Sequence, residues 1–300
     1  MENTQEPSRA LASVSFRRVA IIGVGLMGGS WGLALRRAGF AGIRVGCDRA
    51  ELLEGALERG VIDQGNDDLR AAARAADLVV LATPVRSILE SLPCLREEVS
   101  SDALVTDVGS TKALICQRAR EVFAAGGPMF LGGHPLAGKE RSGLENADAS
   151  LFSGACYAIT PLNANDLSVP RVQCFVSLLT ALGACPFVTD EVLHDRAAAL
   201  LSHLPQLMAT ALAGLVSEEA ANGSLPLALA ASGFRDMTRL AESSYVVWRD
   251  ICATNRENIG RAIDALIQKL GEMKHRLASS ELERDFERAL DLREKLRRIG

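Results

Sequence analysis

The sequence has few of the residues that hold metal ions or form disulfides. It contains four histidines and seven cysteines, with no CxxC pair and no cysteine at metal-ligand spacing to a histidine. We therefore expect no metal site, and we expect reduced thiols of the kind found in cytoplasmic proteins. Residues 1–16 are polar and lack the apolar run of a signal peptide, so they are expected to form a flexible N-terminal arm.

A strong charge of either sign is also missing. The formal net charge is −4, so no general electrostatic field would draw nucleic acid or an anionic membrane, and neither is expected as a partner. The apolar stretch 197–216 is long enough to raise the question of a membrane span. However, it contains His203, Pro205 and Gln206 and is followed by an acidic pair at 218–219. This pattern favours a helix that is buried on all sides in a helical domain.

The first half of the chain alternates between apolar, strand-like runs and helical segments. The strand-like runs are 17–25, 44–48, 77–84, 103–110 and 129–135. The helical segments between them include 28–38, 50–59 and 111–125. Apolar strands separated by helices predict a parallel sheet covered on both faces, with ligands bound at the carboxyl ends of the strands.

The second half shows no strand signals after about residue 190. Helical patterns cover 190–222, 225–232, 236–273 and 280–298. The last of these places its apolar residues near one face among balanced charges, which is typical of a solvated surface helix or of an arm that packs in a dimer. The predicted fold class is therefore α/β, with an α/β domain over 17–189 followed by an all-helical domain over 190–300.

A glycine-rich segment follows the first strand-like run. "VAIIGVGLMGGS" places Gly23, Gly25 and Gly28 in G-x-G-x-x-G spacing, and Asp48 ends the second strand-like run twenty residues later. In this context the spacing predicts the phosphate loop of a Rossmann-type dinucleotide-binding domain. Gly23 permits the tight turn, Gly25 lets the backbone approach the pyrophosphate, and Gly28 allows the helix to pack closely on the strand.

The expected cofactor is NAD rather than NADP. Asp48 should accept hydrogen bonds from the ribose hydroxyls and repel a 2′-phosphate, although the adjacent Arg49 could pair with such a phosphate. A glycine-rich turn in a flavodoxin-like protein would leave Asp48 unexplained. Further cofactor contacts are expected from Leu26 and Met27 in the loop and from Thr83 and Pro84 after the third strand-like run.

His134 follows the fifth strand-like run in the glycine-flanked segment "GGHPLAG". Most lone loop histidines are solvated or bonded to backbone, but this one lies at the sheet edge where the cofactor is expected. An imidazole with a pKa near 6.5 is the usual proton acceptor when an alcohol carbon gives up a hydride. The position therefore predicts a general base.

Several longer segments resemble one enzyme family. They are "DVGSTK" (107–112), "GGHPLAGKERSGLENADASLFSGACYAITP" (132–161), "SHLPQ" (202–206) and "GFRDMTRLAESSYVVWRDICATNRENI" (233–259). Together with the glycine loop, they resemble the prephenate/arogenate (cyclohexadienyl) dehydrogenases of tyrosine biosynthesis. The resemblance implies NAD-dependent oxidative decarboxylation of prephenate to 4-hydroxyphenylpyruvate, of arogenate to tyrosine, or of both. It also implies a homodimer formed mainly by the helical domain.

The resemblance implies a role for each matching residue. His134 corresponds to the histidine that takes the proton from the ring hydroxyl, and Ser110 to a serine that bonds this histidine or the hydroxyl. Arg239 corresponds to an arginine that pairs with a substrate carboxylate. His203 corresponds to a histidine at the other end of the substrate, and Trp248 to an aromatic residue of the site.

Other residues near these motifs admit more than one interpretation. Glu140 is a candidate for the rim of the substrate site, and Lys139 stands where the family commonly has a small hydroxyl residue, which puts the substrate preference in doubt. Lys112 could contact the cofactor or pair on the surface, and Ser110 could merely cap a helix near Thr111. Arg239 could form a structural ion pair, for instance with Asp236. His194 and His275 have no supporting motif and are expected to be structural or exposed.

Two other functions remain as alternatives. A β-hydroxyacid dehydrogenase shares the glycine loop and the helical second domain, but it typically uses a lysine of the helical domain as its acid or base. The lysines of that region here, at 269, 274 and 295, lie in charged late helices. A non-catalytic NAD-binding sensor would bind the cofactor without turning over a substrate.

Overall fold

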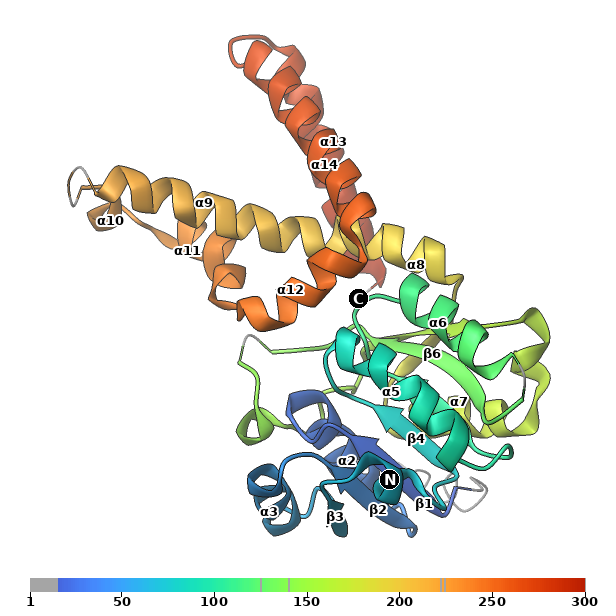
Figure 1. Ribbon diagram of the computed structural model, residues 1–300. Coiled ribbons are helices and arrows are strands. Elements are labelled where there is room, and N and C mark those ends of the chain that lie inside the picture. Colours follow the sequence, from blue (N-terminus) through green and yellow to red (C-terminus); the bar gives the residue numbers. More distant parts are fainter. Residues whose placement is uncertain (1–15, 125, 140, 222, 224, 300) are drawn as a thin grey trace, which may run out of the picture.

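The computed structural model describes residues 16–124, 126–139, 141–221, 223 and 225–299. An eight-stranded sheet forms the lower half of the molecule, and the last third of the chain forms helices above it (Figure 1). The strand order is β3-β2-β1-β4-β5-β6-β7-β8. The strands are β1 Arg18–Ile22, β2 Ile43–Cys47, β3 Gln64–Asn66, β4 Leu78–Leu81, β5 Leu104–Asp107, β6 Met129–Pro135, β7 Cys156–Pro161 and β8 Cys185–Val188.

The sheet is mixed rather than parallel, which corrects the expectation from the sequence. β1 to β6 run parallel, whereas β7 pairs antiparallel with β6 and parallel with β8. The residues between β6 and β7 return the chain without a crossover helix, and a connection of that kind gives an antiparallel neighbour. In the register of this pair, His134 lies opposite Ala158.

Helices cover both faces of the sheet, as the apolar strands predict. Alternate residues of β1 face opposite sides: Ala20 and Ile22 pack with one layer of helices, and Val19 and Ile21 with the other. The first layer consists of α4 Leu69–Ala73, α5 Val85–Glu98 and α6 Ala113–Phe123. The second consists of α2 Leu26–Arg37 and α7 Pro170–Ala181. α3 Ala50–Glu58 packs beside α2 in a smaller cluster, and short 3₁₀ turns lie at Leu144–Asn146 and Ala164–Ser168.

Phe16, the last residue of the expected arm over 1–16, packs into the core. Phe16 is buried in the cluster that contains Trp31, and the guanidinium of Arg171 lies 5.9 Å from the centre of its ring. The apolar ring therefore belongs to the core. Residues 1–15 lie outside the described residues.

A single long helical rod leads from the sheet into the helical region. It consists of α8 Glu191–Ala198, a π-helical turn Ala199–His203 and α9 Leu204–Ala220. Asp190 caps its start by accepting hydrogen bonds from the backbone N–H groups of Val192 and Leu193. The rod is long and apolar enough to cross a membrane by length and composition, but only 22% of its most apolar window is buried. The expectation of a helix buried on all sides is therefore wrong for this chain taken alone.

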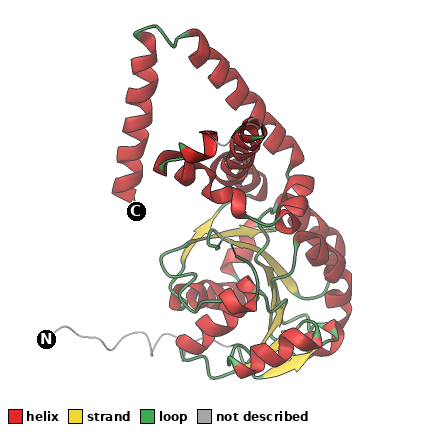
Figure 2. Cartoon of the chain, turned by 90° about the vertical axis from the view of Figure 1, so that its left-hand side faces the viewer, coloured by secondary structure: helices red, strands yellow, loops and turns green. Residues whose placement is uncertain are grey.

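The predicted helix 236–273 is interrupted in the structure. After α10 Leu225–Ala228 the chain forms α11 Ser232–Thr238, a 3₁₀ turn Arg239–Glu242, α12 Tyr245–Thr254, α13 Arg256–His275 and α14 Glu281–Ile299. Ser244 caps α12 through its side chain, and Asn255 separates α12 from α13. α13 and α14 stand away from the sheet as an arm (Figures 1 and 2). Asp285 joins them by ion pairs with Lys269 and Arg276.

Candidate functional site

The glycine loop between β1 and α2 has the backbone that a dinucleotide requires. Gly23 has φ +92°, a conformation that side chains disfavour, and a Cβ there would lie 2.8 Å from the carbonyl oxygen of Ala82. A Cβ on Gly28 would overlap the carbonyl oxygen of Gly23. These two glycines therefore permit the tight turn and the close packing of α2 on β1.

The open side of this loop suits a pyrophosphate. A Cβ built on Gly25 would meet nothing within 4 Å, and no side chain caps the N-terminus of α2. The loop therefore presents uncapped N–H groups to open space at the positive end of a helix. Asp48 holds the loop by accepting a hydrogen bond from the N–H of Val24 at 2.9 Å.

The other expected cofactor residues surround this loop. Thr83 and Pro84 follow β4, and the buried hydroxyl of Thr83, beside Gly23, has no hydrogen-bond partner among the described residues. Pro84 is the residue before the first turn of α5. Arg49 is exposed and precedes α3, so its side chain is free to reach a ligand near Asp48.

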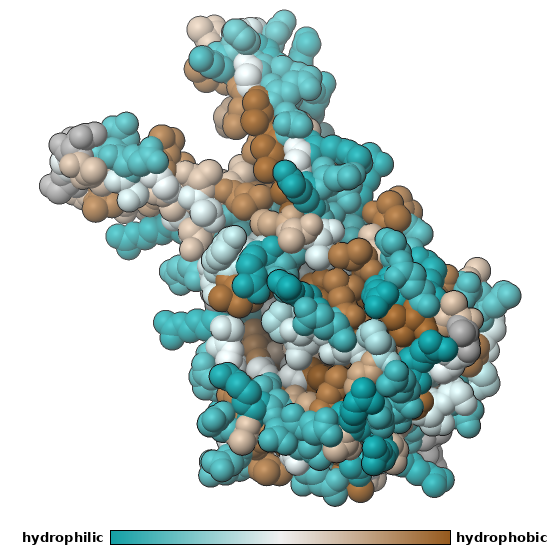
Figure 3. All heavy atoms as spheres, viewed as in Figure 1, coloured by the Kyte–Doolittle hydropathy of each residue, from teal (hydrophilic) through white to brown (hydrophobic). Residues whose placement is uncertain are grey.

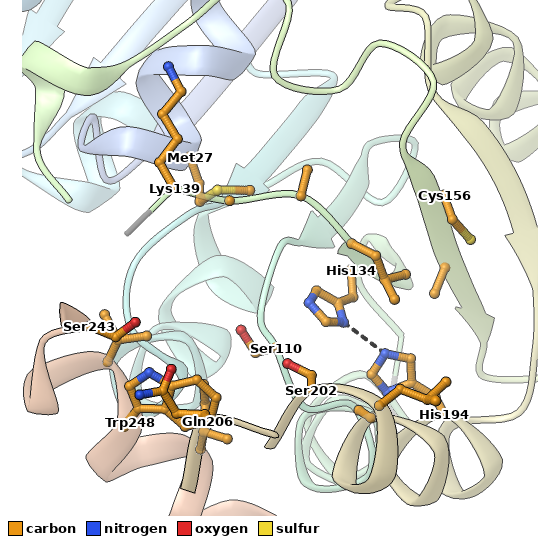
Figure 4. Close-up of a pocket in the computed structure, with 18 of the residues that line it drawn as sticks. Met27, Ser110, His134, Lys139, Cys156, His194, Ser202, Gln206, Ser243 and Trp248 are labelled. Carbon is orange, nitrogen blue, oxygen red and sulfur yellow. Dashed lines mark hydrogen bonds between the residues drawn. The ribbon is translucent and has the colours of Figure 1, made fainter. Parts of the chain in front are cut away.

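A cavity of about 850 Å³ lies between the sheet and the helical region. Both parts of the chain supply its walls, as Figure 4 shows for Met27, Ser110 and His134 on one side and for Gln206 and Trp248 on the other. The cavity brings together seven residues that the sequence singled out: Leu26, Met27, Ser110, His134, Lys139, Arg239 and Trp248. Leu26 and Met27 form the start of α2, directly after the glycine loop, so the expected cofactor site and this cavity are continuous.

His134 lies near the end of β6, with one ring nitrogen bonded inside the protein. Its Nδ1 is 2.8 Å from Nε2 of His194, and the other ring nitrogen lies on the cavity side (Figure 4). Burial lowers the pKa of His134 well below 6.5, and the nearby His194, Lys112 and His203 lower it further. The imidazole is therefore neutral at physiological pH and can accept a proton.

A buried ion pair fixes the backbone just before His134. The ammonium of Lys112 binds the carboxylate of Asp107 and donates to the carbonyl oxygen of Gly133 at 2.8 Å, while Asp107 accepts from the N–H of Gly133 at 3.1 Å. Both side chains are fully buried. The idea that Lys112 pairs on the surface is therefore wrong. Its ammonium bonds the backbone of β6, and it is not among the described residues that line the cavity.

Ser110 lies in the cavity wall and does not cap α6. This helix begins at Ala113, and the carboxylate of Asp195 accepts hydrogen bonds from the N–H groups of Lys112 and Ala113 at 2.7 and 2.9 Å. The hydroxyl of Ser110 points toward the same space as His134 in Figure 4.

His203 occupies a different position from the other expected residues. It is 1% exposed, its ring lies edge-on to Trp248 at 5.8 Å, and its Nδ1 is 3.2 Å from the amide nitrogen of Asn255. Burial lowers its pKa to about 4. Among the described residues, the cavity wall includes its neighbour Ser202 but not His203. Direct contact of His203 with a substrate remains a prediction.

The remaining expected residues lie on the helical side or at the rim. Arg239 opens the 3₁₀ turn Arg239–Glu242 and lines the cavity. Lys139 also lines it, and its ammonium bonds the carboxylate of Asp148 at 3.0 Å. Glu140, the candidate rim residue, lies outside the described residues.

Sequence reasoning missed two residues of the site. His194, expected to be structural or exposed, is buried, lines the cavity and bonds His134. Gln206 also lines the cavity, and its amide donates to the carbonyl oxygen of Leu240 at 2.7 Å, next to Arg239. The "HD" at 194–195 and the scarcity of histidine were the available signals, because a contact between residues 60 positions apart leaves no periodic pattern.

Two family models together match most of this chain. One, described as "Prephenate dehydrogenase, nucleotide-binding domain", matches residues 31–186. The other, described as "Prephenate dehydrogenase, dimerization domain", matches residues 190–294.

Curated relatives and solved structures are similar over nearly the whole chain. A prephenate dehydrogenase of Lactococcus lactis is 32% identical over 93% of this chain and 77% of its own. A cyclohexadienyl dehydrogenase of Zymomonas mobilis is 30% identical over 89% of this chain and 90% of its own. The structure of prephenate dehydrogenase from A. aeolicus, in complex with hydroxyphenyl propionate and NAD+, matches with a TM-score of 0.86. It is 32% identical, covering 95% of this chain and 99% of that one.

Proposed function

This chain belongs to the prephenate dehydrogenase family, and we propose that it catalyses the NAD-dependent oxidative decarboxylation of prephenate, of arogenate or of both. The observation that carries the proposal is the position of His134. A neutral imidazole and a glycine-rich dinucleotide loop face one cavity, and the same cavity contains an arginine.

Each of these groups has a part in the reaction. Arg239 pairs with a substrate carboxylate, since a planar guanidinium matches a carboxylate in two parallel hydrogen bonds. The cavity-facing nitrogen of His134 takes the proton of the ring hydroxyl as the hydride leaves the carbon that bears this hydroxyl. Bound NAD supplies the hydride acceptor. Carbon dioxide then leaves the ring carbon that bears the carboxylate, because its loss makes the ring aromatic.

The protein contributes mainly orientation and proton removal. The Lys112–Asp107 pair holds Gly133 from both its N–H and its carbonyl, so the adjacent His134 is held in one position. Gln206 holds the turn that carries Arg239 through the carbonyl of Leu240. Two rigid supports on opposite walls favour catalysis by fixing the reacting groups in a near-attack geometry.

The experiment that tests this function measures reduced-nicotinamide absorbance. Prephenate and arogenate are each combined with NAD and with NADP, and the wild type is compared with His134→Asn and with His275→Asn. His275 is exposed and is the last residue of α13, so the second variant controls for the loss of an imidazole. We expect turnover with NAD that falls at least 100-fold in His134→Asn alone, while NAD binding is retained. An absence of turnover in all four combinations would exclude the proposed reaction.

We also propose that the chain is a cytoplasmic homodimer that uses the exposed faces of its helical region. Large apolar side chains are exposed there, including Leu201 at 79% and Phe286 at 68%. In Figure 3, brown side chains gather along the arm of α13 and α14. Apolar side chains that gather on one exposed face are costly to leave in water and are typical of an interface. Light scattering should give twice the chain mass of 31.9 kDa, and a monomer at micromolar concentration would contradict the proposal.

A further inference from the structure

His134 is the first member of a hydrogen-bonded chain of three side chains. Its Nδ1 lies 2.8 Å from Nε2 of His194, and Nδ1 of His194 lies 2.8 Å from the carboxylate of Asp195. The two imidazole rings meet edge to face at 5.0 Å, as Figure 4 shows. The side chains of His194 and Asp195 are only 5% and 1% exposed. Water therefore has little access to this chain except at the cavity end.

The far end of the chain fixes the direction of every hydrogen bond in it. Both oxygens of Asp195 face backbone donors, the N–H groups of Lys112 and Ala113 at the start of α6. The carboxylate therefore accepts at all of its contacts, and the positive end of α6 stabilises its charge. Nδ1 of His194 must then carry a hydrogen, and in the neutral ring this makes its Nε2 the acceptor toward His134.

The tautomer of His134 follows from that of His194. Its Nδ1 must donate to His194, so the lone pair of the neutral imidazole lies on Nε2, the nitrogen on the cavity side. The opposite tautomer would place a hydrogen where the substrate proton has to go. It would also bring two lone pairs together between the rings.

Building on the proposed function, we propose that His194 and Asp195 are positioning residues for the dehydrogenation. They fix His134 in the tautomer that can accept the substrate proton, and Nε2 of His194 accepts the hydrogen bond from Nδ1 of His134 before and after the transfer. The O–H bond of the substrate hydroxyl breaks as its proton passes to Nε2 of His134, and no covalent bond of the protein breaks. The resulting imidazolium of His134 donates its Nδ1–H to Nε2 of His194, and His194 donates its own Nδ1–H to the carboxylate of Asp195.

Other charged groups near His134 and His194 do not replace Asp195. Lys112 is paired with Asp107, and Glu191 at the start of α8 is paired with Arg120. His203 is bonded to Asn255, whose amide also donates to the backbone carbonyl of Asp195. Asp195 is therefore the carboxylate that contacts the histidine pair.

The test compares two replacements of His194 that differ in hydrogen bonding. His194→Leu removes the acceptor for Nδ1 of His134, whereas the amide oxygen of His194→Gln can still accept that hydrogen bond. We expect kcat to fall about 100-fold in His194→Leu relative to the wild type, with KM changed less than threefold. In His194→Gln we expect kcat to be at least tenfold higher than in His194→Leu. His275→Leu is the matched control, and melting temperature and NAD binding show which variants are folded.

A second measurement does not depend on activity. Nitrogen-15 shifts of the histidine rings at pH 7.5 report which nitrogen carries the hydrogen. We expect the Nδ1–H tautomer of His134 in the wild type and in His194→Gln, and a mixture of tautomers in His194→Leu. The proposal is overturned if wild-type His134 carries its hydrogen on Nε2, or if folded His194→Leu keeps the wild-type kcat. A wild type with the expected tautomer but no turnover would instead count against the proposed function alone.

Discussion

Replacement of Lys112 by methionine tests how much the buried Lys112–Asp107 ion pair, which bonds the backbone of β6, contributes to stability. The ammonium of Lys112 and the carboxylate of Asp107 are both 0% exposed. In Lys112→Met, Asp107 would keep the N–H groups of Gly109 and Gly133 as donors but lose its cation. The carbonyl of Gly133 would also lose its bond to the ammonium.

The expected loss in free energy of unfolding depends on whether one charge of the buried pair is removed or both. Loss of one partner leaves an uncompensated charge and costs about 3–5 kcal/mol, a large share of a total stability of about 5–15 kcal/mol. Asp107→Asn should cost a similar amount, because it leaves the ammonium of Lys112 buried without a counter-charge. The double variant Asp107→Asn/Lys112→Met leaves no charge behind. We expect it to be less destabilised than the sum of the single variants by about 2–3 kcal/mol.

The assay is urea denaturation followed by circular dichroism at one fixed protein concentration, since dimerisation would couple stability to concentration. Lys274→Met, at an exposed position on α13, is the matched control and should change stability by less than about 0.5 kcal/mol. A cost below 1 kcal/mol for Lys112→Met, or strict additivity in the double variant, would refute the assignment of a buried, coupled pair.

Three further predictions follow from burial and backbone geometry. Burial lowers the pKa of His203 to about 4 in the folded chain. As pH falls below 6.5, His203 is therefore protonated in the unfolded chain before it is protonated in the folded one. Stability should therefore decrease from pH 6.5 toward pH 4, by about 3 kcal/mol for this group. Urea midpoints across this range should fall less in His203→Gln, and equal slopes in both proteins would contradict the prediction. Gly28→Ala should weaken NAD binding at least tenfold in calorimetry, because its Cβ overlaps backbone, whereas Gly260→Ala on α13 meets open space and should leave binding unchanged. Burial raises the pKa of Cys116 to about 12, so a thiol reagent at pH 8 should modify exposed Cys156 well before Cys116 in peptide mapping. Equal labelling would contradict this.

Local sequence patterns predicted the elements that local forces determine. The apolar runs of the central strands and the glycine loop were placed correctly, because burial on both faces and a tight turn each require particular residues at adjacent positions. β3 Gln64–Asn66 and β8 Cys185–Val188 were missed because one is short and polar and the other contains proline. β7 Cys156–Pro161 was not predicted as a strand at all, and its antiparallel direction could not have been predicted either, since periodicity carries no information on strand direction.

The parts of the site that were missed depend on contacts between distant segments. His194 acquires its position only when α8 packs against the end of β6 and the start of α6. Lys112 is polar in sequence, yet a carboxylate five residues earlier lets it be buried. Neither contact changes the local hydropathy pattern, so only the fold or a family resemblance could have indicated it.

The π-helical turn Ala199–His203 lets the residues before and after it on the long rod both line the cavity. A π turn holds one more residue than an α-helical turn, so it sets the rotational phase of everything that follows it. Removal of one residue there would restore a regular helix and swing the following residues by about 100° around its axis. His194, before the turn, would stay beside His134, whereas Gln206 would leave the cavity together with the turn that it holds. This segment can therefore vary in side chains, but its length is part of the design of the site.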